Sequence, residues 1–289
     1  MNKTLIGKDG FLFLQNDSSR EIETHQNNIS LVNNDSLNRY KEHKDKCLLT
    51  VFPDKSMVLR DFLPDGYNLI YRPNFDVYAE FFGERIIDGY AILQNEPDIF
   101  YKTDTHMNLN GCYIIYKHFI KKANELFGFN LSVENLHIEK NITSLVELNI
   151  GYGDLIRECN IGNQILENTD DLYFFNDDIH FYEKYVISHN DPIEFLYLQN
   201  NSFINKTNEL SNRVVNWDII SNHILHIKNI PNPKCKVLIL YDSFLLSTMK
   251  LYMKLFDEVY MFKNVFYEKC IHAINPDYIF EFRIERFLN

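Results

Sequence analysis

Apolar residues recur in regular runs in the C-terminal quarter of the chain. Residues 236–240 hold four consecutive apolar side chains after a lysine, which is typical of a strand buried on both faces of a parallel sheet. Helical periodicity occurs at 244–256 and 265–274, and shorter strand patterns occur at 258–262 and 278–282. This order predicts an α/β fold in which helices cover both faces of a parallel central sheet, in three layers.

The N-terminal half is less regular. Short strands are predicted at 48–52 and at 69–71, and residues 75–90 are predicted to be helical in part. Between 110 and 127, apolar residues recur on one face of a helix, and Gly128 is a suitable stop for it.

Between about 132 and 234 the pattern changes. Short runs alternate aromatic and polar residues, as at 171–175 and 181–185, and turns rich in Asn and Asp separate them. This alternation predicts small antiparallel strands. The chain of 289 residues can bury one large core with a substantial addition. We therefore expect a single domain over 1–289, with a β-rich insertion or subdomain at about 132–234.

The charge balance argues against some partners. Asp and Glu number 40 against 29 Lys and Arg, which gives a net charge of −11, and the basic residues do not cluster. A surface that neutralises phosphates needs clustered positive charge, so we expect neither a nucleic-acid partner nor attraction to an anionic membrane. A neutral sugar or polysaccharide stays open as a ligand.

The cysteines and the N-terminus bear on the compartment. Five widely spaced cysteines without a C-x-x-C pair predict reduced thiols and neither a disulfide framework nor a zinc site. The first residues lack the apolar core of a signal peptide, and no segment approaches the roughly 20 apolar residues of a membrane span. We expect a cytoplasmic protein without a membrane span, or a periplasmic one if a leader was removed.

Ser243 is the first candidate for chemistry. It follows the strand predicted at 236–240 and precedes a predicted helix, and ligands of open α/β sheets bind at the carboxyl ends of strands. Backbone N–H groups at the start of a helix can stabilise an oxyanion. A structural interpretation stays open, because Asp and Ser are also common helix caps, and for Asp242 we prefer that capping role.

A serine hydroxyl needs an adjacent base, and His106 is the most suitable of the ten histidines. Asp104, two residues earlier, can orient the imidazole ring and stabilise its protonated form. Residues two apart in an extended segment point to the same side, so the D-x-H spacing permits this contact. The same residues also suit an ordinary polar loop, and we expect no metal site from them.

Further motifs follow one another along the chain. They are Gly7-Lys-Asp-Gly-Phe-Leu-Phe13, Phe52-Pro-Asp-Lys55 with Leu63-Pro64, Tyr101-Lys-Thr-Asp-Thr-His-Met-Asn108 with Gly111, Gly153-Asp-Leu155, Tyr241-Asp-Ser-Phe244, and the tail from Asn275 to Arg286. In this order the series resembles the alginate O-acetyltransferases of the SGNH-hydrolase-like superfamily, over nearly the whole chain except about 160–230. Three residues depart from that pattern: Tyr241 replaces a Gly, and Met107 and Phe11 each replace a Trp.

The resemblance implies that Ser243 is the nucleophile, His106 the general base and acid, and Asp104 the partner that orients His106. The implied function is a carbohydrate O-acetyltransferase that modifies capsule, O-antigen or a related polysaccharide through an acetyl-serine intermediate. No nucleotide-binding motif occurs, so we expect no tightly bound cofactor. Acetyl-CoA as the acetyl donor follows only from the expected compartment.

Two alternatives stay open. With water as the acceptor, the same triad makes a carbohydrate acetylesterase. A catalytically silent glycan-binding or assembly protein is the other, because Gly permits backbone torsions that Tyr241 does not. Charged residues also alternate along the last predicted strand and its end, at Glu281, Arg283, Glu285 and Arg286, and we expect them to form ion pairs rather than to bind substrate.

Overall fold

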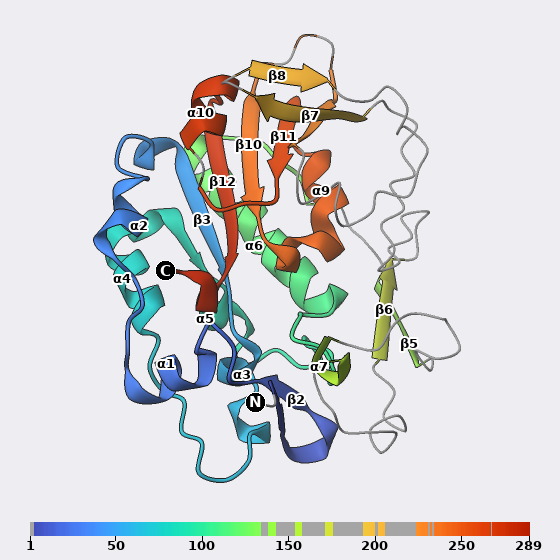
Figure 1. Ribbon diagram of the computed structural model, residues 1–289. Helices are drawn as coiled ribbons and strands as arrows, with labels where there is room; N and C mark the ends of the chain where they lie inside the picture. The colour runs from blue at the N-terminus through green and yellow to red at the C-terminus, as the bar shows by residue number, and fades with distance from the viewer. Residues whose placement is uncertain are drawn as a thin grey trace.

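Figure 1 shows the computed structural model, which describes residues 3–133, 138–142, 154–157, 171–175, 193–199, 202–205, 224–230, 232, 234–266 and 268–289. The chain begins with β1 (Thr4–Ile6), the 3-10 helix η1 (Lys8–Gly10), β2 (Leu12–Leu14), α1 (Glu21–Asn27), α2 (Asn34–Asn38) and η2 (Lys44–Lys46). It continues with β3 (Cys47–Phe52), α3 (Lys55–Val58), η3 (Arg60–Phe62), α4 (Pro73–Phe82), η4 (Gly83–Arg85), β4 (Ile86–Asp88), α5 (Gly89–Leu93) and α6 (Leu109–Phe127).

The middle of the chain contributes β5 (Ile138–Ile142), α7 (Asp154–Arg157), β6 (Asp171–Phe175), β7 (Ile193–Gln199), β8 (Ser202–Asn205) and β9 (Ile224–Lys228). The C-terminal part contains β10 (Lys236–Tyr241), η6 (Ser243–Thr248), α9 (Met249–Met253), β11 (Glu258–Phe262), α10 (Glu268–Ile274), β12 (Tyr278–Ile284) and η7 (Glu285–Phe287).

The central sheet has eight strands in the order β4-β3-β12-β10-β11-β9-β7-β8. The first five strands of this order run parallel, whereas β9, β7 and β8 join the sheet in antiparallel pairs. β10 lies between β12 and β11, with Tyr241 opposite Phe282. The carboxyl end of β10 therefore opens in the middle of the parallel part of the sheet.

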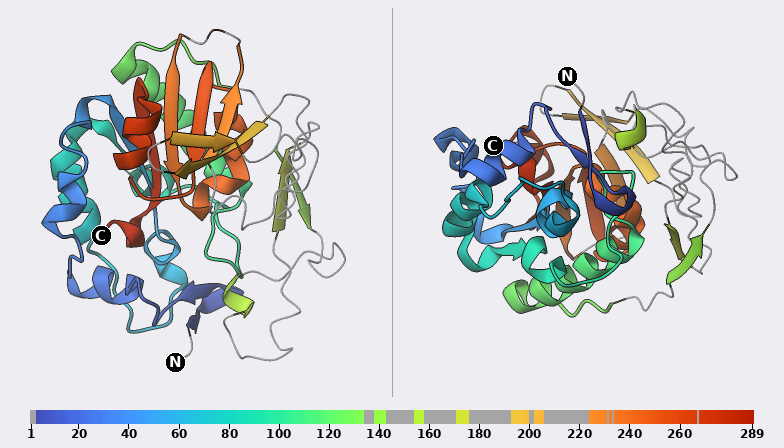
Figure 2. Two further views of the ribbon diagram at one scale, coloured as in Figure 1. Left: turned by 45° about the horizontal axis from the view of Figure 1, so that its top comes forward. Right: turned by 90° about the horizontal axis from the view of Figure 1, so that it is seen from below.

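Side chains of β10 alternate between two hydrophobic cores, as expected for a strand buried on both faces. Val237 and Ile239 pack with α5, α6, η6 and α9 on one face of the sheet. Leu238 and Leu240 pack with α4 and α10 on the other face. The sheet thus lies between two helical layers (Figure 2), and the predicted three-layer α/β/α fold is confirmed.

The segment predicted as an insertion contributes strands in two places. β5 and β6 form a separate antiparallel pair, and β6 coincides with the strand predicted at 171–175. β7, β8 and β9 instead extend the central sheet itself, so the sheet is parallel only in its first five strands. The strand predicted at 181–185 lies outside the described residues, and the division of 1–289 into one domain with an insertion stays a prediction.

Local sequence signals set the ends of α6. The side chain of Asn108 accepts a hydrogen bond from the Gly111 N–H, and Gly128 ends the helix with a φ of 68°. The helix predicted at 244–256 is in fact two shorter helices, η6 and α9, because its first turns have 3-10 geometry. The strand predicted at 69–71 is wrong: Tyr71 N–H bonds to the carbonyl of His25 in an irregular segment.

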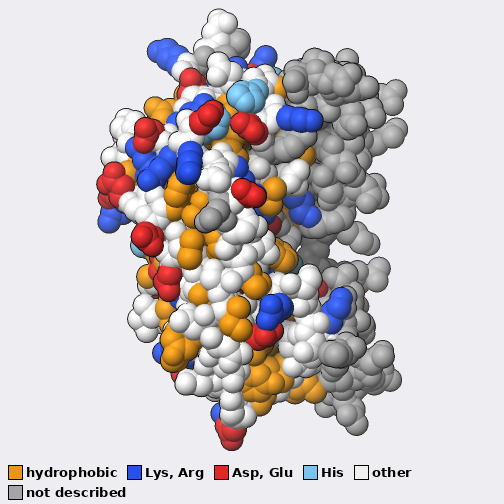
Figure 3. Space-filling model, turned by 60° about the vertical axis from the view of Figure 1, so that its left-hand side comes forward, with side chains coloured by type: hydrophobic (Ala, Val, Ile, Leu, Met, Phe, Trp, Pro, Cys, Tyr) orange, Lys and Arg blue, Asp and Glu red, His pale blue; other side chains and the backbone are white. Residues whose placement is uncertain are grey.

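Figure 3 shows the face that carries α2 and α4, where acidic and basic side chains are interspersed among hydrophobic ones. Among the described residues, no helix has both the length and the apolar character that a membrane crossing requires. Cys47, Cys112, Cys235 and Cys270 are free thiols, and Cys159 lies outside the described residues.

Gly111 lets α6 approach the segment that precedes His106. A Cβ atom at Gly111 would lie 2.6 Å from the carbonyl oxygen of Ile99. Alanine usually stabilises a helix by about 1 kcal/mol relative to glycine. Here we expect Gly111→Ala to lower the free energy of unfolding by about 1–3 kcal/mol, because the backbone must shift.

Urea unfolding followed by circular dichroism measures this difference. Lys121→Ala, at an exposed position of the same helix, is the control and should change the free energy of unfolding by less than about 0.5 kcal/mol. Greater stability of Gly111→Ala would contradict the close approach of α6 to Ile99.

Candidate active site

Ser243 begins η6 directly after the central strand β10. The preceding residue, Asp242, accepts hydrogen bonds from the N–H of Phe244 at 2.9 Å and from the N–H of Ile284 at 2.6 Å. The expected capping role of Asp242 is therefore confirmed. Its carboxylate also ties the end of β10 to the end of β12, which fixes the backbone on both sides of Ser243.

Tyr241 occupies the position where the resemblance predicts glycine. It is the last residue of β10, it pairs with Phe282 in regular register, and only 1% of its surface is exposed. Extended backbone is open to every residue type, so this position does not need the torsional freedom of glycine. The conformational reason for expecting an inactive protein is therefore removed.

Asp104, His106 and Ser243 meet at the carboxyl end of β10, although 137 positions separate His106 from Ser243 along the chain. The distance between Ser243 Oγ and His106 Nε2 is 2.9 Å, and the distance between His106 Nδ1 and Asp104 Oδ1 is 2.6 Å. Because a carboxylate can only accept, the neutral ring carries its proton on Nδ1 and offers Nε2 to the serine hydroxyl. The His106 side chain is 32% exposed, so a reactant can approach it.

The environment favours the charged forms of both Asp104 and His106. Burial tends to raise the pKa of Asp104, but the charge and hydrogen bonds of His106, with the N–H of Asp154, hold it well below its ordinary value. Burial tends to lower the pKa of His106, but the Asp104 and Asp154 carboxylates outweigh this effect and raise it. The arrangement therefore suits a histidine that accepts a proton and holds it as an imidazolium. The catalytic role of the three residues stays a prediction.

Asp154 is a site residue to which the sequence analysis assigned no role. Its carboxylate accepts hydrogen bonds from the Thr105 N–H at 2.8 Å and the Thr105 hydroxyl at 2.5 Å, and its own N–H donates to Asp104 Oδ2 at 2.9 Å. The available signal was the Gly153-Asp-Leu155 motif, which a single sequence does not connect to a histidine some 50 residues earlier.

Asp104, His106 and Asp154 also offer three ligand atoms within 4.8 Å of one another, which is the spacing of a possible cation site. Both Asp104 oxygens and both Asp154 oxygens already accept hydrogen bonds from the protein, and His106 Nδ1 faces a carboxylate. We therefore interpret the cluster as a hydrogen-bonded one and assign no metal to it.

Lys55 holds the same loop through two hydrogen bonds to its backbone. Its buried ammonium donates to the carbonyl of Lys102 at 2.8 Å and to the carbonyl of Asp104 at 2.9 Å. The N–H of Leu12, in β2, donates to the same Lys102 carbonyl at 2.9 Å. The loop that carries Asp104 and His106 is thus held by the two N-terminal motifs found in the sequence.

A buried ionic network lies behind Phe244. Asp54 pairs with Arg286 at 2.9 Å and with His25 at 2.9 Å, and the Arg286 guanidinium lies 5.2 Å from the centre of the Phe244 ring. Burial tends to lower the pKa of His25, but the hydrogen bond and charge of Asp54 raise it to about 9. The Phe244 ring in turn lies 4.5 Å from the His106 ring.

The charged residues of the last strand pair as expected. Arg283 contacts Glu281 at 2.8 Å, Arg72 donates three hydrogen bonds to Glu285, and Arg286 contacts Asp54. Glu281, Arg283, Glu285 and Arg286 are all buried, in agreement with the expected ion pairs.

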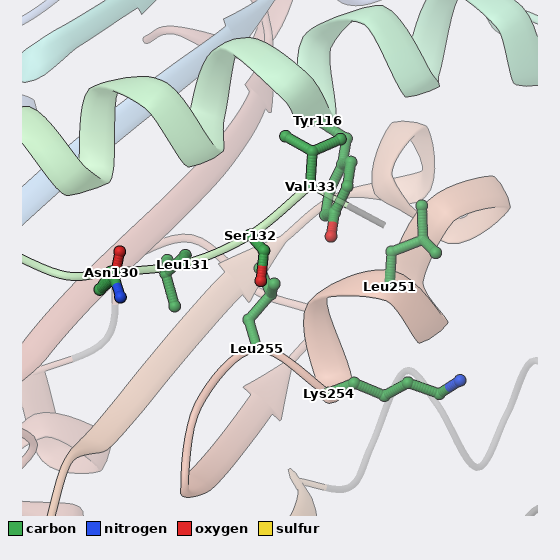
Figure 4. A pocket seen from close by; sticks show the side chains of 8 residues that line it. All are labelled: Tyr116, Asn130, Leu131, Ser132, Val133, Leu251, Lys254 and Leu255. Carbon is green, nitrogen blue, oxygen red and sulfur yellow. The ribbon is translucent and has the colours of Figure 1, made fainter. Parts of the chain in front are cut away.

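A cavity of about 360 Å³ lies between α6 and α9 (Figure 4). Its lining consists of Tyr116, Asn130, Leu131, Ser132, Val133, Leu251, Lys254 and Leu255. Ser243 and His106 do not line this cavity, and we assign it no role in acyl chemistry.

Several solved structures share the fold of this chain. Bacillus cereus PatB1, in a structure with a sulfonyl adduct, has a TM-score of 0.61 and 14% identity over 100% of this chain and 97% of that chain. A DHHW family protein from Eubacterium siraeum has a TM-score of 0.59 and 15% identity over 99% and 94%. The O-acetyltransferase domain of Pseudomonas putida AlgJ has a TM-score of 0.54 and 14% identity over 99% and 91%.

No protein-family model and no curated protein sequence matches the chain. At the identities found among the solved structures, the likeness establishes the fold and not the reaction. The chain has a three-layer α/β/α arrangement and shares its fold with the AlgJ domain.

Proposed function

We propose that this chain is a serine-dependent O-acetyltransferase that acts on a hydroxyl group of a polysaccharide. The observation that carries the proposal is the hydrogen-bonded series from Ser243 through His106 to Asp104, with distances of 2.9 Å and 2.6 Å. The likeness in fold to the AlgJ O-acetyltransferase domain supports the choice of reaction. Capsule, O-antigen and related glycans are the proposed acceptors.

In the first half-reaction, Ser243 Oγ attacks the carbonyl carbon of the acetyl donor while its proton passes to His106 Nε2. Asp104 keeps the ring oriented through Nδ1 and stabilises the imidazolium. The bond between the acetyl carbon and the leaving group then breaks, and the leaving group takes the proton from Nε2. The product is an acetyl ester on Ser243.

In the second half-reaction, a sugar hydroxyl gives its proton to Nε2 as its oxygen attacks the ester carbon. Ser243 Oγ departs and recovers that proton, which leaves the acetyl group on the sugar. Both steps place negative charge on the carbonyl oxygen. The Phe244 N–H is engaged by Asp242, so we assign the stabilisation within this turn to the N–H of Ser243 itself.

Acetyl transfer to a sugar is the expected outcome when the protein is incubated with acetyl-CoA, or with an activated acetyl ester, and candidate oligosaccharides. Acetyl-CoA is the donor we propose to test first. Mass spectrometry of the sugar and assay of free acetate distinguish the two acceptors. Release of acetate at a rate that no oligosaccharide changes would instead identify a carbohydrate acetylesterase.

An arylsulfonyl fluoride is expected to modify Ser243, and the sulfonyl adduct of PatB1 suggests this class of reagent. Ser243→Ala should abolish the mass increase, and His106→Ala should slow the modification roughly 100- to 10,000-fold, because the serine loses its base. Ser247→Ala, in the same 3-10 helix, is the matched control and should be modified normally. If the folded parent protein binds glycan but the reagent never modifies it, the catalytically silent glycan-binding protein is the correct alternative.

The rate of Ser243 acylation by the activated ester should rise with pH, because only the neutral His106 accepts a proton. Since the Asp104 carboxylate raises the pKa of His106, the midpoint should lie above the ordinary value of about 6.5. Asp104→Asn should lower both the midpoint and the maximal rate. Rapid-mixing measurement of the first turnover gives both quantities, and an unchanged midpoint in Asp104→Asn would contradict the assigned pair.

A further inference from the structure

Asp154 contacts the loop of Asp104, Thr105 and His106 on two sides. Its backbone N–H donates to Asp104 Oδ2 at 2.9 Å. Its carboxylate accepts from the Thr105 N–H at 2.8 Å and from the Thr105 hydroxyl at 2.5 Å. Asp154 therefore holds both the carboxylate of Asp104, which contacts His106, and Thr105, the residue between Asp104 and His106.

The Asp154 carboxylate also acts on His106 through its charge. Asp154 Oδ2 lies 3.7 Å from His106 Nδ1, on the side of the ring where Asp104 Oδ1 lies at 2.6 Å. The charged groups that face the ring are Asp104, Asp154 and Arg286; the two carboxylates favour the imidazolium, and the guanidinium opposes it. Burial and the charge of Asp104 raise the pKa of Asp154 itself, whereas the charge of His106 and the two hydrogen bonds from Thr105 oppose this rise.

The position of Asp154 is fixed by the N-terminal hairpin. Asp154 begins α7, and the next residue, Leu155, is buried and accepts a hydrogen bond from the Thr4 hydroxyl at 2.7 Å. α7 lies beside β1 and β2 in Figure 1 and in the left view of Figure 2. β2 also holds the chain just before Asp104, because the Leu12 N–H donates to the Lys102 carbonyl. One hairpin therefore locates both partners of the contact.

We propose that Asp154 is a positioning residue of the active site, which orients Asp104 through its N–H, holds Thr105 through its carboxylate, and adds a second negative charge that stabilises protonated His106. This inference rests on the proposed acyl-transfer function. Asp154 touches neither Ser243 nor a reacting atom, so it acts through the other members of the site.

Asp154→Asn is the most direct test, because it removes the charge and keeps an acceptor oxygen and the backbone N–H. We expect the pKa of His106, from NMR titration of the labelled ring, to fall by about one pH unit, since an opposite charge at this distance has been removed. We expect the rate of acylation of Ser243 to fall roughly 10-fold, because the imidazolium that forms as Ser243 reacts loses a stabilising charge worth about one pKa unit. The matched control Asp76→Asn removes the same charge at an exposed position of α4 and should change neither quantity.

Thr105→Val provides a second variant of almost the same shape, which removes the hydroxyl contact to Asp154 at 2.5 Å and the longer one to His106 Nδ1 at 3.5 Å. It should slow acylation in the same direction but by less than Asp154→Asn does. Circular dichroism establishes that each variant is folded, and the spectrum of His106→Gln assigns the ring signal.

The two proposals fail in different ways. If the activated ester and the sulfonyl fluoride leave Ser243 of the parent unmodified, the acyl-transfer function and the role of Asp154 are both overturned. If the parent is modified but Asp154→Asn keeps the parent's His106 pKa and acylation rate, only the positioning role is overturned.

Discussion

The site depends on the burial of one ionised carboxylate, that of Asp104. Its side chain is only 11% exposed, and a charge removed from water is costly unless donors replace the water. Three donors do so: the N–H and Nδ1–H of His106 and the N–H of Asp154. Two of them belong to the histidine that Asp104 orients, so the bonds that stabilise the charge also set the direction of the imidazole ring toward Ser243.

The motifs that are scattered along the sequence meet around this loop. Lys55 supports the carbonyl of Asp104, Leu12 holds the chain at Lys102, and Gly111 permits the helix that follows His106 to begin close by. Lys55 and Leu12 each donate a hydrogen bond to a backbone carbonyl of the loop, and glycine at position 111 leaves room for α6 to approach Ile99. These contacts bring residues of the two N-terminal motifs and of α6 to one loop, and Ser243 reaches the same loop from the C-terminal part of the chain.

Arg286, in η7 directly after the last strand, adds a second support near Ser243. Buried ion pairs add little net stability but are costly to break, so they act mainly by restricting geometry. Arg286 is held by Asp54 and packs against Phe244, and Phe244 packs against His106. Residues just after the carboxyl ends of β3, β10 and β12 thereby hold Ser243 and His106 together.

The sequence by itself determined the elements whose signals are local. The apolar run of β10, the periodicity and stop of α6, and the two-residue spacing of Asp104 and His106 each depend on neighbours in the chain, and each was predicted. The tertiary structure alone decided the antiparallel edge of β9, β7 and β8, the irregular course of residues 69–71, and the contact of Asp154 with Thr105. These features depend on hydrogen bonds between distant segments, and local periodicity carries no information about which distant donor or acceptor a residue will meet.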